Sequence, residues 1–195
     1  MYQKYQTEAL VLGSRPSGEN DRVFSLYTKD FGLVRARASA VRTERSKMRY
    51  ALQSYARADV SLVRGRTGWR VAGAAAQYPR GDTSRIAGGE GARAYARIAE
   101  LTLRLVHGEE KNDFLFATLA EAHDTLMQNS VSAWATIEIV CVARVLFALG
   151  YLSAEALQTA LFTHTAYGNA HLQEAEGLRD KLLSSINKAI AETHL

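Results

Sequence analysis

The hydrophobic period of this 195-residue chain changes once, near residue 80, and that change limits the folds open to it. Before Pro79, apolar and polar side chains alternate, which is typical of half-buried strands. After a glycine-rich segment, RGDTSRIAGGEG, apolar residues recur every three to four positions, which is typical of amphipathic helices. The two periods predict an α+β chain with two domains, residues 1–80 and residues 81–195.

The first domain is predicted to be a small β-barrel. Strands are expected over residues 7–14, 22–28, 33–40, 52–63 and 69–77, with turn signals between them. Five short strands in about 80 residues, with a long insertion before the fourth, favour a closed barrel over a sandwich. The OB-fold has this size and strand count, and we expect a five-stranded OB-fold here.

The second domain is predicted to be a helical bundle. One helix should end at His107-Gly108, two more should cover 113–128 and 133–149, a short one should follow Ser153, and the last should run over 174–192. The helix over 133–149 is apolar nearly all round, so we expect it at the centre of the bundle. It contains Arg144, which must be paired if it is buried. Either Arg144 forms an internal salt bridge, with Glu138 or another carboxylate, or it surrounds a pocket for an acidic peptide together with Arg93, Arg97 and Arg104.

The net charge of +4 is divided unevenly. Residues 1–81 hold 15 Lys and Arg against 6 Asp and Glu, whereas residues 82–195 hold 9 against 14. This asymmetry suggests that the first domain faces a polyanion such as nucleic acid. The single cysteine, Cys141, excludes an internal disulfide and a multi-cysteine zinc site. We find no signal peptide and no apolar run long enough to span a membrane, and expect a cytoplasmic protein.

The cations of the first domain concentrate between Gly32 and Tyr50. Over residues 33–40, small apolar side chains alternate with Leu33, Arg35, Arg37 and Ser39, which predicts a strand with an exposed basic face. A basic loop without apolar periodicity follows. Surfaces that bind single strands combine cations for phosphates with aromatic rings for base stacking. The predicted nucleic-acid-binding residues are therefore Arg35, Arg37, Arg42, Arg45, Lys47 and Arg49, with Tyr27, Tyr50 and Trp69 as stacking candidates.

Signatures of an enzyme are weak or missing. The glycines of residues 88–91 lack the Lys-Ser/Thr pair of a phosphate loop, and the five histidines lack metal-ligand spacing. Glu19 and Asp21 follow a Pro and a Gly, so we interpret them as turn stabilisers. We predict no catalysis, no cofactor and no metal ion.

Two segments of the first domain resemble the recombination protein O (RecO) family of DNA-repair mediators. They are LVLGSRPSGENDRVFSLYTKDFGLVRARASAVR and RSKMRYALQSYARADVSLVRGRTGWRVAGAA. The family pattern begins with a Gly-Glu-x-Asp turn, here residues 18–21, and continues with a leucine–threonine strand and a glycine, here Leu26, Thr28 and Gly32. A small-residue strand, a basic loop and then Leu-Gln and an aromatic follow, here Leu52, Gln53 and Tyr55. The order and spacing match across about 75 residues.

The resemblance implies an N-terminal OB-fold, a helical C-terminal domain and DNA-repair activity without catalysis. It implies binding of single- and double-stranded DNA, annealing of complementary strands, and contacts with RecR and with the acidic tail of single-strand DNA-binding protein, which together help RecA load onto coated DNA. The chain departs from the family in two respects. Many members carry a four-cysteine zinc site, which a sequence with one cysteine cannot form, and the sequence is short for the family. Two other readings stay open: an OB-fold protein that binds RNA or the ribosome, and a scaffold whose basic loop meets an acidic protein.

Overall fold

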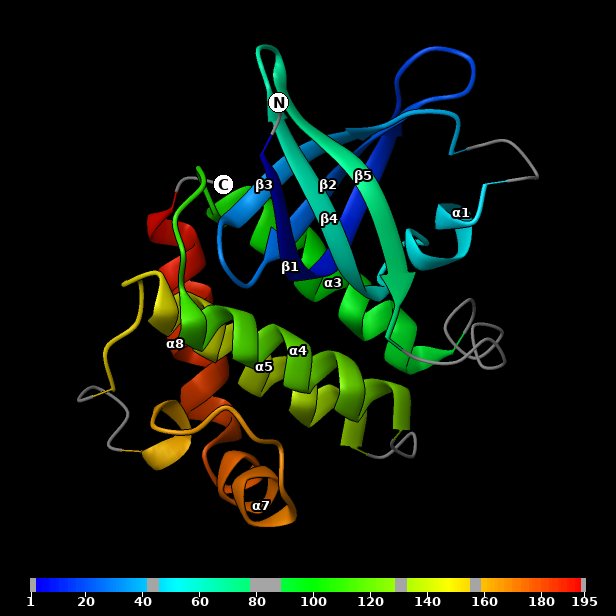
Figure 1. Ribbon diagram of the computed structural model, residues 1–195. Helices are drawn as coiled ribbons and strands as arrows, with labels where there is room; N and C mark the ends of the chain where they lie inside the picture. Colours follow the sequence, from blue (N-terminus) through cyan, green and yellow to red (C-terminus); the bar gives the residue numbers. More distant parts are fainter. Residues whose placement is uncertain (1–2, 42–45, 78–88, 129–132, 155–158, 194–195) are drawn as a thin grey trace. The chain divides into compact units, whose positions relative to one another are not determined.

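The computed structural model describes residues 3–41, 46–77, 89–128, 133–154 and 159–193 (Figure 1). The contacts between residues divide the chain into two compact units. One unit holds the strands together with the segment His107–Asp113, and the other holds the helices. The predicted α+β class, with strands first and helices after them, is confirmed.

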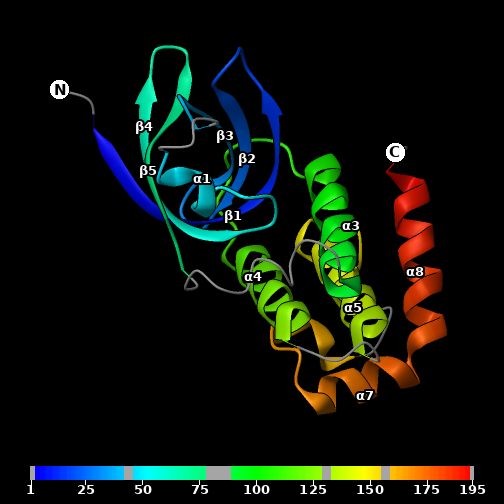
Figure 2. The ribbon, with the colours of Figure 1, turned by 90° about the vertical axis from the view of Figure 1, so that its right-hand side faces the viewer.

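The first unit is a closed five-stranded barrel. Its strands are β1 (Lys4–Pro16), β2 (Arg22–Thr28), β3 (Gly32–Ala38), β4 (Arg57–Gly65) and β5 (Gly68–Ala76). They close in the order β1-β2-β3-β5-β4, and Figure 2 shows them curving around a common interior. The β3–β5 pair is parallel and the other four pairs are antiparallel. The OB-fold expected from the sequence is confirmed.

Alternating small and branched side chains fill the barrel. On β2 and β3, Phe24, Leu26, Val34 and Ala36 are buried in one core cluster with Ala58, Val60 and Leu62 of β4. Arg35 and Arg37 lie between the buried positions of β3 and are exposed, so the predicted alternation is confirmed for them. Leu33 differs, since it shares their parity but is buried.

The connection before β4 contains a helix that the sequence did not predict. The expected strand began at residue 52, but β4 begins at Arg57 and is preceded by the short helix α1 (Met48–Ala51). Ala51 and Leu52 are buried in the barrel core, so these apolar residues close one end of the barrel instead of extending a strand. Tyr55 then turns the chain with a φ of +65° and donates its N–H to the Val11 carbonyl at 2.8 Å.

The second unit is a bundle around one buried helix. Its elements are α3 (Glu90–Leu105), α4 (Asp113–Gln128), α5 (Trp134–Ala148), the 3-10 turn η2 (Ala160–Phe162), α7 (Asn169–Gly177) and α8 (Arg179–Glu192). Helix α5 contacts α3, α7, α8 and η2, which confirms its predicted central place. The helix expected over 174–192 is instead two helices that meet at Leu178.

Two further expectations concern a short helix and the absence of a membrane span. The short helix expected after Ser153 falls largely on residues 155–158, which lie outside the described residues. Across the described part of the chain, none of the helices combines the length and apolar character needed to cross a membrane.

Candidate nucleic-acid interface

Strand register places three arginines in one line across the barrel. Arg15 on β1 pairs with Val23 on β2, Val23 pairs with Arg37 on β3, and Arg37 pairs with Arg70 on β5. Directly paired residues point to the same face of a sheet, and neighbouring strands lie about 4.8 Å apart. All three side chains are exposed. Arg35 lies on the same face of β3, two residues before Arg37, and we call these four arginines the cationic row.

Half of the cationic row was missed from the sequence. The alternation along residues 33–40 predicted Arg35 and Arg37, but nothing in the sequence indicated that Arg15 and Arg70 would join them. The parallel pairing of β3 with β5 brings Arg70 into line, and that pairing joins segments more than thirty residues apart. Alternation along the fifth strand puts Arg70 on the outer face opposite Trp69, but it does not show which strand Arg70 lies beside.

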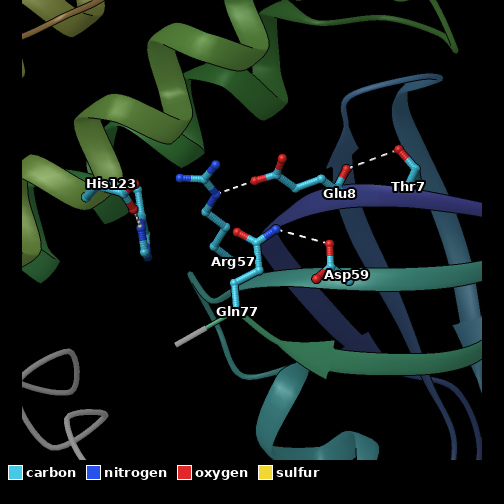
Figure 3. Close-up of polar contacts among 7 residues, drawn as sticks. Thr7, Glu8, Arg57, Asp59, Gln77 and His123 are labelled. Carbon is cyan, nitrogen blue, oxygen red and sulfur yellow. Dashed lines mark hydrogen bonds and ion pairs between the residues drawn. The ribbon is translucent and has the colours of Figure 1, made fainter. Parts of the chain in front are cut away.

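The ion pairs of the barrel leave most of the cationic row with a net positive charge. Arg37 pairs with Asp21 at 2.7 Å. Arg15, Arg35 and Arg70 have no ion-pair partner among the described residues. On β1 and β4, in contrast, Arg57 pairs with Glu8, and the Gln77 side-chain amide donates to Asp59 at 3.1 Å (Figure 3). Three of the four arginines in the cationic row are therefore not neutralised by a carboxylate of the described residues.

Asp21 fixes the point at which the chain leaves β3 for the basic loop. One carboxylate oxygen accepts from Arg37 Nε at 2.9 Å, and the other accepts from the Ala40 N–H at 2.9 Å. Ala40 has a φ of +53°, a conformation that non-glycine residues rarely adopt without support. The Ala40 and Arg37 hydrogen bonds hold the pKa of Asp21 below its usual value of 3.8. Asp21 thus ties the end of the β1–β2 turn to the exit of β3.

The basic loop is described only in part. Arg42 and Arg45 lie outside the described residues. Lys47 and Arg49 are exposed, and neither has an ion-pair partner among the residues that the structure describes. Tyr50 follows Arg49 on α1 and is 53% exposed, so its ring has the access that base stacking requires.

The structure corrects two of the three predicted stacking residues. Tyr27 is 1% exposed, and burial raises the pKa of its hydroxyl well above the usual range, with the carboxylates of Asp113 and Glu110 adding to the shift. Trp69 is 6% exposed and points into the barrel core. Its ring packs edge-on against Tyr5, with 5.5 Å between ring centroids. Neither ring is accessible to a base, because both side chains are packed within the protein.

The four arginines predicted as a partner site do not form one cluster, because three are exposed on α3 and Arg144 is buried on α5. Arg93, Arg97 and Arg104 are exposed along α3, and each is held by a carboxylate at 2.6 Å, from Glu90, Glu138 and Glu100 respectively. Residues at these spacings share one side of a helix. They remain candidates for a partner surface.

Arg144 is a structural residue, which corrects its predicted role. It is fully buried and donates to the carbonyls of Leu161 at 2.8 Å, Thr165 at 2.8 Å and Ala166 at 3.1 Å. The expected salt bridge, with Glu138 or another carboxylate, is not formed among the described residues, where Glu138 pairs with Arg97. Neutral carbonyls, which belong to the chain before α7, satisfy the guanidinium instead.

The residues that carried the family resemblance also shape the β2–β3 turn. The Thr28 hydroxyl donates to the Gly32 carbonyl at 2.9 Å and accepts from the Phe31 N–H at 3.1 Å. Gly32 has a φ of +64°, and a Cβ there would lie 2.1 Å from the Glu110 carbonyl oxygen. Threonine closes this turn, and only glycine fits beside the 107–113 segment.

Reactive groups are scarce in the described residues. Burial raises the pKa of the Cys141 thiol to about 12, so this thiol stays protonated at neutral pH and is a poor nucleophile. Within the described ranges, no group of three His, Cys, Asp or Glu side chains is placed to hold a metal ion.

Comparison with known proteins finds a family match and a similar protein for the barrel region. The family described as "Recombination protein O N terminal" matches residues 1–71. A protein named "DNA repair protein RecO" from Bifidobacterium animalis subsp. lactis (strain AD011) is 43% identical over 63 residues. That match covers 32% of this chain and 26% of the relative, so it spans about a quarter of the relative's length. The resemblance to the RecO family drawn from the sequence is confirmed over the barrel.

Proposed function

We propose that this chain, whose first 71 residues match the RecO N-terminal family, is a non-catalytic DNA-binding protein of recombinational repair that anneals complementary strands. The observation that carries the proposal is the cationic row on the outside of a closed OB barrel. The row contains four arginines and one paired carboxylate, so its net charge suits a phosphate backbone.

The chemistry of the row favours binding without sequence reading. Exposed guanidinium groups neutralise phosphates and release counterions, which gives affinity but carries no base information. The accessible ring of Tyr50 adds stacking, which every base allows. A surface of this kind holds single strands of any sequence, as an annealing protein must.

Annealing requires two polyanions to be held close together. The cationic row binds one strand, and the basic loop of Arg42, Arg45, Lys47 and Arg49 binds the second. The loop begins directly after Ala40, which Asp21 hydrogen-bonds, so it starts at a fixed point beside the row. Cations between the two strands lower their mutual repulsion, and base pairing then supplies the specificity.

The proposed partners extend this role. They are single- and double-stranded DNA, RecR, and the acidic tail of single-strand DNA-binding protein, with loading of RecA onto coated DNA as the outcome. For the acidic tail, the exposed Arg93, Arg97 and Arg104 of α3 are the proposed contacts. Each already holds a carboxylate, so a carboxylate-rich peptide would exchange with groups of the same chemistry.

Strand annealing on coated DNA tests the proposal. Complementary strands are coated with single-strand DNA-binding protein, either intact or lacking its acidic tail, and duplex formation is followed by fluorescence after the chain is added. The expected result is annealing that is faster with the tail than without it. Equal rates in both cases would remove the tail from the proposal, and no annealing in either case would contradict it.

Competition separates DNA from RNA as the polyanion. The chain bound to a labelled single-stranded DNA is titrated with unlabelled DNA of the same length or with a structured RNA. The proposal expects DNA to displace the label at the lower concentration. Preferential displacement by the RNA would favour the alternative that the protein binds RNA or the ribosome.

A further inference from the structure

A cavity of about 320 Å³ lies at the end of the barrel where α1 follows the basic loop. Buried apolar side chains, Phe24, Val41 and Leu52, form part of its wall. Its polar lining residues are Ser14, Arg22, Arg49, Gln53 and Ser54. None of the described lining residues is acidic. The volume falls at the lower end of the range of about 300–1,000 Å³ that is usual for small-ligand sites.

Arg22 is an arginine on the inner side of a barrel strand. Inward positions alternate along β2, and Arg22 shares its parity with the core residues Phe24 and Leu26. Its Nε is buried and has no hydrogen-bond partner among the described residues. The neighbouring carboxylate of Asp21 is already occupied by Arg37 and by the Ala40 N–H. A buried donor left without an acceptor is costly, so a ligand oxygen at this point would be stabilised.

Arg49 supplies a second guanidinium to the same cavity. It comes from α1, is exposed, and has no ion-pair partner among the residues described. The hydroxyls of Ser14 and Ser54 and the amide of Gln53 add neutral donors. Two guanidinium groups with several neutral donors, and without a carboxylate among the described lining residues, match a tetrahedral oxyanion such as phosphate.

A second cavity in the same unit provides an internal contrast. It is larger, about 610 Å³, and its charged lining residues are Glu8, Asp30 and Asp59 against Lys29 alone. The excess of carboxylates there repels an anion. The larger cavity is therefore not expected to bind phosphate, whereas the smaller cavity of Arg22 and Arg49 is. The charge of the lining, not the volume, makes the difference.

We propose that the cavity of Arg22 and Arg49 is a phosphate-binding site for the second strand, which the basic loop holds. This inference rests on the proposed function and adds to it one fixed point of contact, at which a single phosphate is bound by both arginines. The exposed cations of the basic loop alone let this strand slide, whereas a phosphate in the cavity fixes one position of the strand at the barrel end. The phosphate has two possible sources, an internal phosphodiester or the terminal phosphate of a strand.

Nuclear magnetic resonance of the full chain tests the site directly. The protein is titrated with inorganic phosphate at constant ionic strength, and the Arg22 Nε–H and the backbone amides of Gln53 and Ser54 are followed. We expect saturable shifts at these signals. Arg22→Gln and Arg49→Gln should each weaken phosphate binding on the order of tenfold, since each removes charge-assisted hydrogen bonds. The control Lys29→Gln, in the acidic cavity, should leave phosphate binding unchanged.

Several results would overturn the proposal. They are the absence of saturable shifts, unchanged phosphate affinity in both arginine variants, and a loss of affinity in the Lys29→Gln control equal to theirs. Arg49 is exposed, so Arg49→Gln keeps the test valid even where Arg22→Gln impairs folding.

Two thymidine probes then separate the sources of the phosphate. The dinucleoside monophosphate TpT carries only an internal phosphodiester, and pTpT carries a terminal phosphate as well. Equal binding of both supports the site and identifies an internal phosphate, whereas binding of pTpT alone supports it and identifies a strand end. If neither probe shifts the cavity signals, the proposal fails. This failure is distinct from that of the proposed function, because the cationic row is measured separately by the salt dependence of DNA binding.

Discussion

Replacing Arg15, Arg35 and Arg70 together by glutamine should reduce the salt dependence of single-stranded DNA binding. These are the members of the cationic row without an ion-pair partner among the described residues. Arg37 is kept because it also holds Asp21, so the triple variant preserves the exit of β3. Glutamine retains the length of the side chain and removes its charge. The variant therefore tests the charge of the row with little change in packing.

The size of the effect follows from the number of phosphate contacts. Each contact with a single strand contributes about −0.7 to the slope of log affinity against log salt, so loss of three should flatten the slope by about 2. Between 50 and 200 mM salt, the variant should then lose roughly 20-fold less affinity than the wild type loses. Fluorescence anisotropy with a labelled oligothymidine across this range measures both slopes.

A matched control separates placement from total charge. Lys29, Lys181 and Lys188 are exposed and lie outside the cationic row, and changing all three to glutamine alters the net charge by the same amount. Their triple variant should keep a slope close to that of the wild type. The reasoning fails if the two triple variants flatten the slope equally, or if the row variant leaves the slope unchanged.

Three further predictions concern residues that support the two units. Gly32→Ala should cost about 2 kcal/mol or more in urea unfolding, because a Cβ at φ +64° would lie 2.1 Å from the Glu110 carbonyl oxygen; an unchanged midpoint would contradict this close approach. Arg144→Met should cost about 3 kcal/mol, because three buried carbonyls lose their donor, yet it should leave the salt slope of DNA binding intact; a changed slope would point to a binding role for Arg144. Asp21 has a lowered pKa, so its stabilisation is present above the unfolded value of 3.8 and is lost as the pH falls through the lower folded value. The stability advantage of the wild type over Asp21→Asn should therefore be full at pH 7 and vanish in acid, and an advantage independent of pH would refute this assignment.

The strands were predictable where one face is buried. β2 begins and ends as predicted, at Arg22 and Thr28, because Phe24 and Leu26 alternate with more exposed residues. The end of the barrel was not predictable in the same way. Ala51 and Leu52 belong to an apolar run that looks like the start of a strand, but they pack over the end of the barrel from α1. Tertiary packing, which period alone does not reveal, decided between helix and strand there.

The candidate site was predictable only in its local part. Alternation along one strand placed Arg35 and Arg37 on the outer face, whereas register between distant strands added Arg15 and Arg70. Alternation also places Trp69, which faces inward on β5 although the basic Arg70 follows it.

Buried arginines set a further limit on prediction from the sequence. Arg144 and Arg22 are both arginines in or beside apolar surroundings, and the sequence does not distinguish them. The structure gives three carbonyl partners to Arg144, whereas Arg22 Nε has no hydrogen-bond partner among the described residues. Pairing of a charged group depends on segments that are distant in the chain, so it becomes visible only when the backbone path is known.

The proposed role of the cationic row in annealing can be measured as the rate at which two complementary single strands pair in the presence of this chain. Uncoated strands of about 50 nucleotides at low salt are mixed with the wild type or with the variant lacking the charges of Arg15, Arg35 and Arg70. We expect the wild type to accelerate pairing above the spontaneous rate and the variant to lose most of this acceleration. Pairing at the spontaneous rate with the wild type, or undiminished acceleration by the variant, would contradict this role.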